Sequence, residues 1–223
     1  MENYLLNLGK KAKNLSTSII DSNKKNQVLK DYCKLILKNK QKIITENKKD
    51  LSNATYKGLK ENLLQRLLIN EKKIFEIINS LKAIIKFKDP VDRTLANWIR
   101  PNGLKIKKKT IPIGVVSVIY ESRPNVTSDV SCLCFKSGNA VILRGGSEAL
   151  NSNKILAYLF RQSLKFNKVN ENFVQIIDNQ NRKSVDYMLS KMQNFIDVII
   201  PRGGKNLVKK VQSLSSVPII GHL

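Results

Sequence analysis

The sequence is poor in the residues that form disulfides, hold metals or anchor a chain in a membrane. It contains three cysteines, one histidine and one tryptophan among 223 residues. An odd number of cysteines without the spacing of a disulfide framework fits a reducing compartment. No apolar run approaches the roughly 20 residues that cross a bilayer, and the amino terminus has no apolar export segment. We therefore expect a soluble, cytoplasmic protein with no metal and no membrane partner.

Acidic residues are also scarce, since 17 of them stand against 40 lysines and arginines and leave a formal net charge of +23. Such a charge is typical of proteins that bind nucleic acid or anionic membranes. However, the lysines are scattered along every helical segment and are not interleaved with aromatic residues, as they are in single-strand binders. We favour a lysine-rich composition without a specific nucleic-acid partner, and a basic nucleic-acid-binding protein is the less favoured alternative. The charge should still give weak affinity for polyanions at low salt.

The first 89 residues show the three-to-four-residue apolar spacing of amphipathic helices. Two stripes carry this spacing: Leu29, Tyr32, Cys33, Ile36, Leu37, Ile43 and Ile44, then Ile74, Ile77, Ile78, Leu81, Ile84 and Ile85. Residues 53–58 separate the stripes and are expected to form a loop. Pro90 ends the second helix, because proline cannot continue the hydrogen-bond ladder. No residue here suggests chemistry, so we expect a helical segment 1–89 that packs on the remainder.

Residues 90–110 change from helical to strand-like spacing. Asn102 and Gly103 lie between two short strand-like runs, and this dipeptide favours a tight hairpin turn. One alternative is that Trp98, which precedes the turn, is a stacking platform for a ligand. We favour a β-hairpin that packs on another element or on another subunit.

From residue 111 onward, short apolar runs alternate with segments of helical spacing. The expected strands are 115–120, 140–143, 173–177, 196–200 and 217–220. Strands that alternate with helices form parallel sheets with right-handed crossovers. The sequence thus predicts an α/β fold with a doubly wound, mainly parallel, five-stranded Rossmann-like sheet. Polar residues gather after the carboxyl ends of its strands, at the edge where such sheets bind ligands.

Two stretches of the sequence closely resemble one enzyme family. The words YESRPNVTSDVSCLCFKSGNAVILRGGSEA and DVIIPRGGKNLV resemble gamma-glutamyl phosphate reductase, also called glutamate-5-semialdehyde dehydrogenase, of the aldehyde dehydrogenase superfamily. The resemblance implies the NADPH-dependent reduction of gamma-glutamyl phosphate to glutamate 5-semialdehyde and phosphate, a step of proline biosynthesis. It also implies that residues 90–110 are the oligomerisation hairpin of a homo-oligomer and that residues 111–223 are the NADP-binding cofactor domain.

The resemblance assigns roles to two residues. Asn125 matches the family asparagine whose side-chain amide helps to hold the oxyanion, and a fixed N–H donor there is worth about 3–4 kcal/mol. The alternative is that Asn125 only caps the helix that begins at Val126, because asparagine is a favoured cap. Arg144 matches a basic position near the adenosine ribose, where an arginine suits a 2′-phosphate and hence NADPH rather than NADH.

The remaining predicted cofactor contacts follow from the same matches. They are Ser122, Arg123, Pro124, Gly145, Gly146, Ser147, Glu148, Gly203 and Gly204. The glycines would let the backbone approach the cofactor, and Gly203 and Gly204 begin a helix near the expected pyrophosphate. Three alternatives stay open: plain tight turns for the glycine pairs, ordinary helix caps for Ser147 and Glu148, and a surface ion pair for Arg123 in place of the acyl phosphate.

The family's nucleophilic cysteine lies in a second α/β domain that has no counterpart in this sequence. Cys33 and Cys134 belong to apolar stripes, and Cys132 lies within the same helix as Cys134. The single histidine, His222, is at the end of the chain and gives a cysteine no anchored base. We therefore expect none of the three to be the nucleophile. The chain is predicted to be the amino-terminal part of a reductase that is inactive alone, and an NADP(H)-binding subunit of a split enzyme is the alternative.

Overall fold

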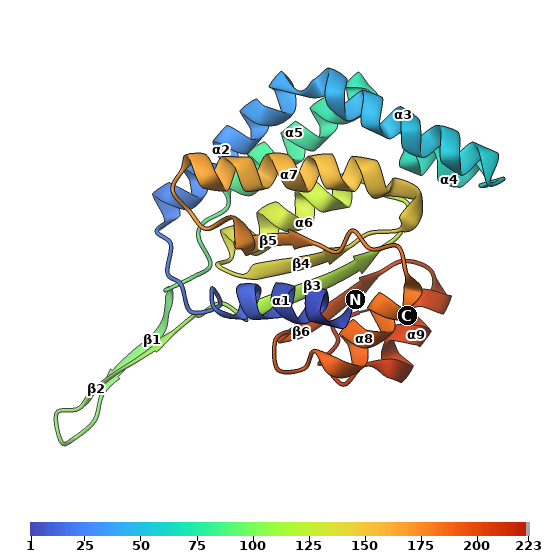
Figure 1. Ribbon diagram of the computed structural model, residues 1–223. Coiled ribbons are helices and arrows are strands. Elements are labelled where there is room, and N and C mark those ends of the chain that lie inside the picture. Colours follow the sequence, from blue (N-terminus) through green and yellow to red (C-terminus); the bar gives the residue numbers. More distant parts are fainter. Residues whose placement is uncertain (222–223) are drawn as a thin grey trace.

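The centre of the protein is a parallel sheet of four strands in the order β5-β4-β3-β6 (Figure 1). In this computed structural model, which describes residues 1–221, the strands are β3 (Val115–Tyr120), β4 (Ala140–Arg144), β5 (Val174–Ile176) and β6 (Val198–Arg202). Every residue of β3 and β4 is buried. Their runs of valine, isoleucine and leucine suit strands that helices cover on both faces. The predicted α/β fold with a parallel sheet is confirmed.

Helices lie on both faces of this sheet (Figure 1). The helices that cover it are α1 (Glu2–Lys13), α6 (Asn125–Lys136), α7 (Leu150–Phe166), α8 (Arg182–Lys191) and α9 (Lys205–Leu214). One face carries α6 and α7, and the other carries α1, α8 and α9. Two single turns of 3-10 helix, η1 (Ser147–Ala149) and η2 (Glu171–Phe173), precede α7 and β5. No helix among residues 1–221 has the length and apolar character to cross a membrane.

The first 89 residues are helical, as predicted, and most of them form an outer layer over α6 and α7 (Figure 1). The helices of this layer are α2 (Ser22–Lys38), α3 (Lys40–Tyr56), α4 (Glu61–Leu67) and α5 (Glu71–Lys86). The predicted loop at residues 53–58 is wrong for residues 53–56, because α3 continues to Tyr56 and buries Ala54 against Leu67, and right for residues 57 and 58, which form a turn. In this turn Gly58 has a φ of 70°, which is costly for a residue with a side chain.

A row of aromatic rings joins this outer layer to the sheet layer. The ring centroid of Tyr32 on α2 lies 4.7 Å from that of Phe160 on α7. Phe135 lies 5.8 Å from Phe160 and 5.6 Å from Phe173. All four side chains are buried, and edge-to-face pairs of this kind add about 0.5–1.5 kcal/mol beyond the area they bury. Residues 1–89 therefore share one core with the α/β part.

A β-hairpin projects from the rest of the molecule (Figure 1). Its strands β1 (Thr94–Ile99) and β2 (Lys105–Lys109) are antiparallel, and Trp98 pairs with Ile106. Gly103 takes a φ of 82° in the connecting turn, as the predicted hairpin requires. The side chains of β1 are exposed along its whole length. Its apolar residues are therefore not covered by any other part of residues 1–221.

The predicted fifth strand is reduced to a single bridge. Ile219 pairs in parallel with Ile199, with Ile199 N donating to Pro218 O at 2.9 Å and Ile220 N donating to Ile199 O at 3.0 Å. The ladder cannot extend through Pro218, because proline has no N–H to donate. Within residues 1–221 the sheet therefore has four strands rather than five.

Candidate functional site at the carboxyl edge of the sheet

The carboxyl ends of β3, β4 and β6 meet at one edge, because these strands are neighbours and run parallel. The register places Tyr120 of β3 beside Arg202 of β6, and Ile119 of β3 beside Arg144 of β4. The strand ends and the segments that follow them contain every predicted site residue. The structure thus brings these residues to one edge, and their contacts with a ligand stay predictions.

Asn125 is the first residue of α6, directly after Pro124. Its Nδ2 donates to Asp129 Oδ2 at 3.2 Å, and Asp129 Oδ1 accepts a second bond from Ser80 Oγ on α5 at 2.9 Å. No side chain caps the start of this helix within residues 1–221, so the capping interpretation of Asn125 is wrong. An amide nitrogen carries two hydrogens, and the one not given to Asp129 can reach an oxygen of a ligand.

Asn125 lines a cleft of about 340 Å³ beside α6 and β6. The other polar residues of its lining are Arg123, Asp129 and Arg202, and the apolar ones are Val118, Val126, Val130, Leu133, Cys134 and Ile200. Arg123 makes no ion pair within residues 1–221, so the surface ion pair is not found there. Arg202 was not predicted, although its position at a strand end directly before Gly203 was a signal for it. Two arginines beside one amide suit a small ligand with negative charge.

The environment of Asp129 allows a test of this cleft. Burial is the largest influence and raises the pKa of Asp129, while the hydrogen bonds from Ser80 and Asn125 lower it. Because the pKa in the folded state is raised, stability falls as the pH rises through it. We expect Asp129→Asn to gain stability relative to the wild type as the pH rises above about 4 in urea denaturation. Ser80→Ala should lose stability at the higher pH, and identical pH profiles for the three proteins would contradict a raised pKa of the half-buried Asp129.

Arg144 ends β4 and is only 8% exposed. Its guanidinium donates to Gly145 O and, at 3.5 Å, to Gln180 O. Within residues 1–221, its Nε has no hydrogen-bond partner. Burial lowers the pKa of Arg144 and the nearby Glu148 raises it, yet an arginine stays charged in proteins. The sheet edge therefore holds a charged donor whose hydrogen-bonding capacity is only partly used.

Glu148 joins the turns that follow β3 and β4. Its Oε1 accepts from Ser122 N at 2.7 Å and from Ser122 Oγ at 2.8 Å. Ser122 has a φ of 42°, which is uncommon for a residue with a side chain, and the two bonds stabilise this conformation. The helices η1 and α7 begin without a side-chain cap from Ser147 or Glu148 in the described chain, so the capping alternative is wrong for both.

The turn of Gly203 and Gly204 leads directly into α9, with Gly204 as the N-cap. Gly204 N donates to Glu121 Oε2 at 3.0 Å. A Cβ at position 203 would overlap the ends of the Glu121 and Leu207 side chains, so both flexible side chains would have to move to admit one. Glu121 was not predicted as a site residue, because its local sequence does not reveal which way an exposed carboxylate after a strand points.

These groups suit the phosphates of a dinucleotide. The amino terminus of α9 offers free N–H groups and the positive end of the helix dipole, and Arg144 offers a charged N–H without a partner in residues 1–221. Both glycine turns lie against a carboxylate, Glu148 at Gly146 and Glu121 at Gly203. The donors therefore fit a phosphate-bearing cofactor, provided that a carboxylate moves.

The three cysteines, all within the described residues, are not placed as nucleophiles. Cys33, Cys132 and Cys134 are at most 9% exposed. Burial raises the pKa of each thiol, and that of Cys134 to about 12. Such a thiol is not ionised at neutral pH and attacks poorly. His222 lies outside the described residues, and residues 1–221 contain no group of three or more cysteine, histidine or acidic side chains that could hold a metal.

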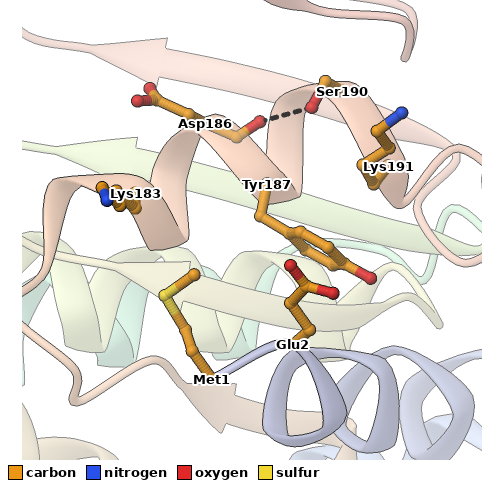
Figure 2. A pocket seen from close by; sticks show the side chains of 7 residues that line it. All are labelled: Met1, Glu2, Lys183, Asp186, Tyr187, Ser190 and Lys191. Carbon is orange, nitrogen blue, oxygen red and sulfur yellow. Dashed lines mark hydrogen bonds between the residues drawn. The ribbon is translucent and has the colours of Figure 1, made fainter.

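A second hollow, of about 440 Å³, lies away from this edge, where the start of α1 faces α8 (Figure 2). Its lining consists of Met1, Glu2, Lys183, Asp186, Tyr187, Ser190 and Lys191. Figure 2 shows Ser190 Oγ bonded to the backbone oxygen of Asp186, at 2.8 Å within α8. The hollow contains none of the predicted site residues and carries surface charges of both signs, so we assign it no function.

Comparison with known proteins identifies the relatives of the chain. The gamma-glutamyl phosphate reductase of Clostridium tetani is 45% identical over 222 residues, which are 99% of this chain and 52% of that protein. The gamma-glutamyl phosphate reductase of Caldanaerobacter subterraneus is 45% identical over 213 residues, 95% of this chain and 51% of that protein. No protein-family model matches the chain. The chain spans about half the length of the curated relatives it matches.

Solved structures agree with this relationship. The crystal structure of gamma-glutamyl phosphate reductase from Thermotoga maritima matches with a TM-score of 0.93 and 36% identity, over 96% of this chain and 52% of that chain. A probable aldehyde dehydrogenase from Listeria monocytogenes matches with a TM-score of 0.72 and 16% identity, over 99% of this chain and 46% of that chain. That likeness shows the shared fold alone. The chain is therefore related over its whole length to the gamma-glutamyl phosphate reductases, as its two sequence words predict, and it spans about half of such a protein.

Proposed function

We propose that the chain forms the cofactor-binding half of a reductase that uses NADPH to convert gamma-glutamyl phosphate into glutamate 5-semialdehyde and phosphate. The name of its relatives supports this oxidoreductase reaction. One observation carries the proposal: Asn125, Arg144 and Gly204 lie at a single sheet edge in a chain with these relatives. A role in proline biosynthesis is part of this proposal, because the sequence resemblance implies that glutamate 5-semialdehyde is formed on that pathway.

The residues of the edge divide into a substrate part and a cofactor part. In the cleft, the amide of Asn125 stabilises the negative charge that develops on the acyl oxygen, and Asp129 holds this amide in place. Arg123 and Arg202 attract and orient the anionic substrate in the same cleft. Arg144 and the amino terminus of α9 bind phosphates of the cofactor. NADPH, when bound, supplies the hydride.

In this reaction, the thiolate that attacks the substrate belongs to a cysteine outside these 223 residues. The cysteines of the chain are buried, and burial raises the pKa of their thiols. A segment equivalent to the remaining half of the relatives would supply the nucleophile. That segment either continues the same reading frame or belongs to a separate chain, in which case this chain is the cofactor-binding subunit of a split enzyme.

Binding and reconstitution test this proposal. Titration calorimetry of the purified chain should show one NADPH site, and added polypeptide equivalent to the other half of the relatives should restore NADPH oxidation with gamma-glutamyl phosphate. Turnover by the chain alone would contradict the proposal that the attacking thiol lies outside this chain. No NADPH binding in either sample would contradict the whole proposal. The DNA beyond the codon for Leu223 distinguishes a continuous enzyme from a split one.

We further propose that the hairpin contacts a second copy of the chain. Leu95, Trp98 and Ile99 expose apolar surface on an element that nothing else in residues 1–221 covers, and contiguous exposed apolar surface marks interaction sites. The neighbouring strand β2 carries four lysines. Because like charges that face each other across a contact are unfavourable, the apolar face of β1 is the better candidate for a contact between copies.

Removal of this apolar face should therefore prevent association. Leu95, at the irregularity of the pairing between Thr94 and Ala96, and Ile99 are the two most exposed large apolar side chains of β1. We expect the double change Leu95→Ser and Ile99→Ser to convert an oligomer into a folded monomer in light scattering, because both side chains are exposed and belong to no core within residues 1–221. Lys108→Ser on β2, an exposed residue that pairs with Ala96 on the other face of the hairpin, is the matched control and should leave the oligomer intact. A wild-type chain that stays monomeric at every concentration would contradict the hairpin contact.

A further inference from the structure

The two carboxylates at the glycine turns are held in different ways. Glu148, at the turn after β4, accepts two bonds from Ser122. Glu121 Oε2 accepts only the Gly204 N–H, at 3.0 Å, among the hydrogen bonds of residues 1–221. The same carboxylate fills the space beside Gly203. Glu121 is therefore the more weakly held of the two and lies directly at the start of α9.

Glu121 reaches this turn because β3 and β6 are neighbours. The register pairs Tyr120 with Arg202, so the residues that follow these two strand ends lie side by side. Glu121 is exposed and forms no ion pair within residues 1–221. Its carboxylate is stabilised by the free N–H and the positive end of the helix dipole at the start of α9. Solvent-exposed interactions of this kind are weak, so a ligand can replace them.

A phosphate at this turn would need the place that Glu121 occupies. Both groups are anions that accept hydrogen bonds from the amino terminus of a helix. The absence of a side chain at Gly203 leaves space for one such acceptor, and the carboxylate fills it. Two negative groups at this distance would also repel each other. A phosphate can therefore bind at the Gly204 amide only when the side chain of Glu121 has left it.

We propose that Glu121 is an internal competitor of the cofactor. In the ligand-free protein its carboxylate closes the turn at Gly204, and a dinucleotide phosphate binds there only after this side chain has rotated away. That the ligand is a dinucleotide rests on the proposed function above. The competition lowers the apparent affinity in proportion to the fraction of molecules with an open turn, so that an open fraction of about one tenth weakens binding about tenfold.

Titration of the full 223-residue chain with NADPH tests this competition. Glu121→Ala removes the carboxylate and should lower the Kd about tenfold. Glu121→Gln keeps the shape but removes the charge, and should give an intermediate Kd. Glu61→Gln, in the exposed first turn of α4, changes the net charge by the same amount away from the site and should bind like the wild type. Melting curves check that all four proteins are folded.

The outcomes separate this inference from the proposed function. Equal affinity of Glu121→Ala and the wild type, or weaker binding by the variant, would overturn the competition and leave the cofactor proposal standing. If neither protein binds NADPH, the proposed function fails, and sodium pyrophosphate then serves as the probe, with the NMR signal of the Gly204 amide as the readout. A lower pyrophosphate midpoint in Glu121→Ala supports the competition, whereas equal midpoints, or no shift in either protein, overturn it.

Discussion

Replacing Asp50 by alanine is expected to lower the free energy of unfolding by about 3–5 kcal/mol. Asp50 lies on α3 and is 2% exposed. Its Oδ1 accepts from Asn151 N at 3.1 Å and Asn151 Nδ2 at 2.9 Å, and its Oδ2 accepts from Ser152 N at 2.8 Å and Ser152 Oγ at 2.7 Å. Asp50 thus supplies from a distance the cap that the first turn of α7 lacks. Its loss would leave one buried and one partly buried backbone N–H group without an acceptor, and a buried group of this kind costs about 1–3 kcal/mol.

Urea denaturation measures this effect, and the chain contains a matched control. Asp21 caps α2 in the ordinary local way, since its carboxylate accepts from Lys24 N at 2.9 Å, and it is exposed. Asp21→Ala should therefore cost only about 1 kcal/mol. Asp50→Asn keeps one acceptor oxygen and should lie between the two alanine variants. A loss for Asp50→Ala no larger than that for Asp21→Ala would show that the remote cap contributes little.

The elements of the fold follow from local patterns, which is why most of them could be predicted. The apolar run of β3 and the helical spacing of α5 are readable within a few residues of sequence. Gly103 and Gly138 take the positive φ values that their places in a turn and at a helix end require. The errors arose where distant contacts decide. Ala54 stays helical because Leu67 packs on it, and residues 217–220 form only a bridge beside β6.

The site could be predicted in position but not in geometry. The alternation of strands and helices puts Arg144 and Gly203 at the same sheet edge. The direction of a side chain depends on partners far away in the sequence, and for that reason the roles of Glu121 and Asp129 were missed. Glu121 bonds to a residue 83 positions away, and Asp129 bonds to one 49 positions away. No local pattern reports such pairs.

The high positive charge of the chain affects how cofactor binding has to be measured. A formal net charge of +23 attracts any polyanion, so that NADPH binding measured at low salt would include a non-specific part. Non-specific attraction falls steeply with ionic strength, whereas bonds to a buried arginine and to backbone N–H groups are screened much less. Cofactor measurements on this chain are therefore informative only at physiological salt, and they should distinguish NADPH from NADH.

Arg144→Gln is expected to weaken NADPH binding about 10- to 100-fold and NADH binding by less than about threefold, because charged hydrogen bonds contribute about 1.5–3 kcal/mol. The cofactors differ by the 2′-phosphate, for which we propose the guanidinium of Arg144 as the charged donor, since its buried Nε has no partner in residues 1–221. Titration calorimetry at physiological salt measures both affinities.

Arg202→Gln removes the same charge from the cleft side of the edge and should not distinguish the two cofactors. Glutamine also fills most of the buried space of Arg144, so melting curves should stay close to the wild type. Equal losses for NADPH and NADH would instead assign Arg144 to the structure of the turn, where it already bonds Gly145 O.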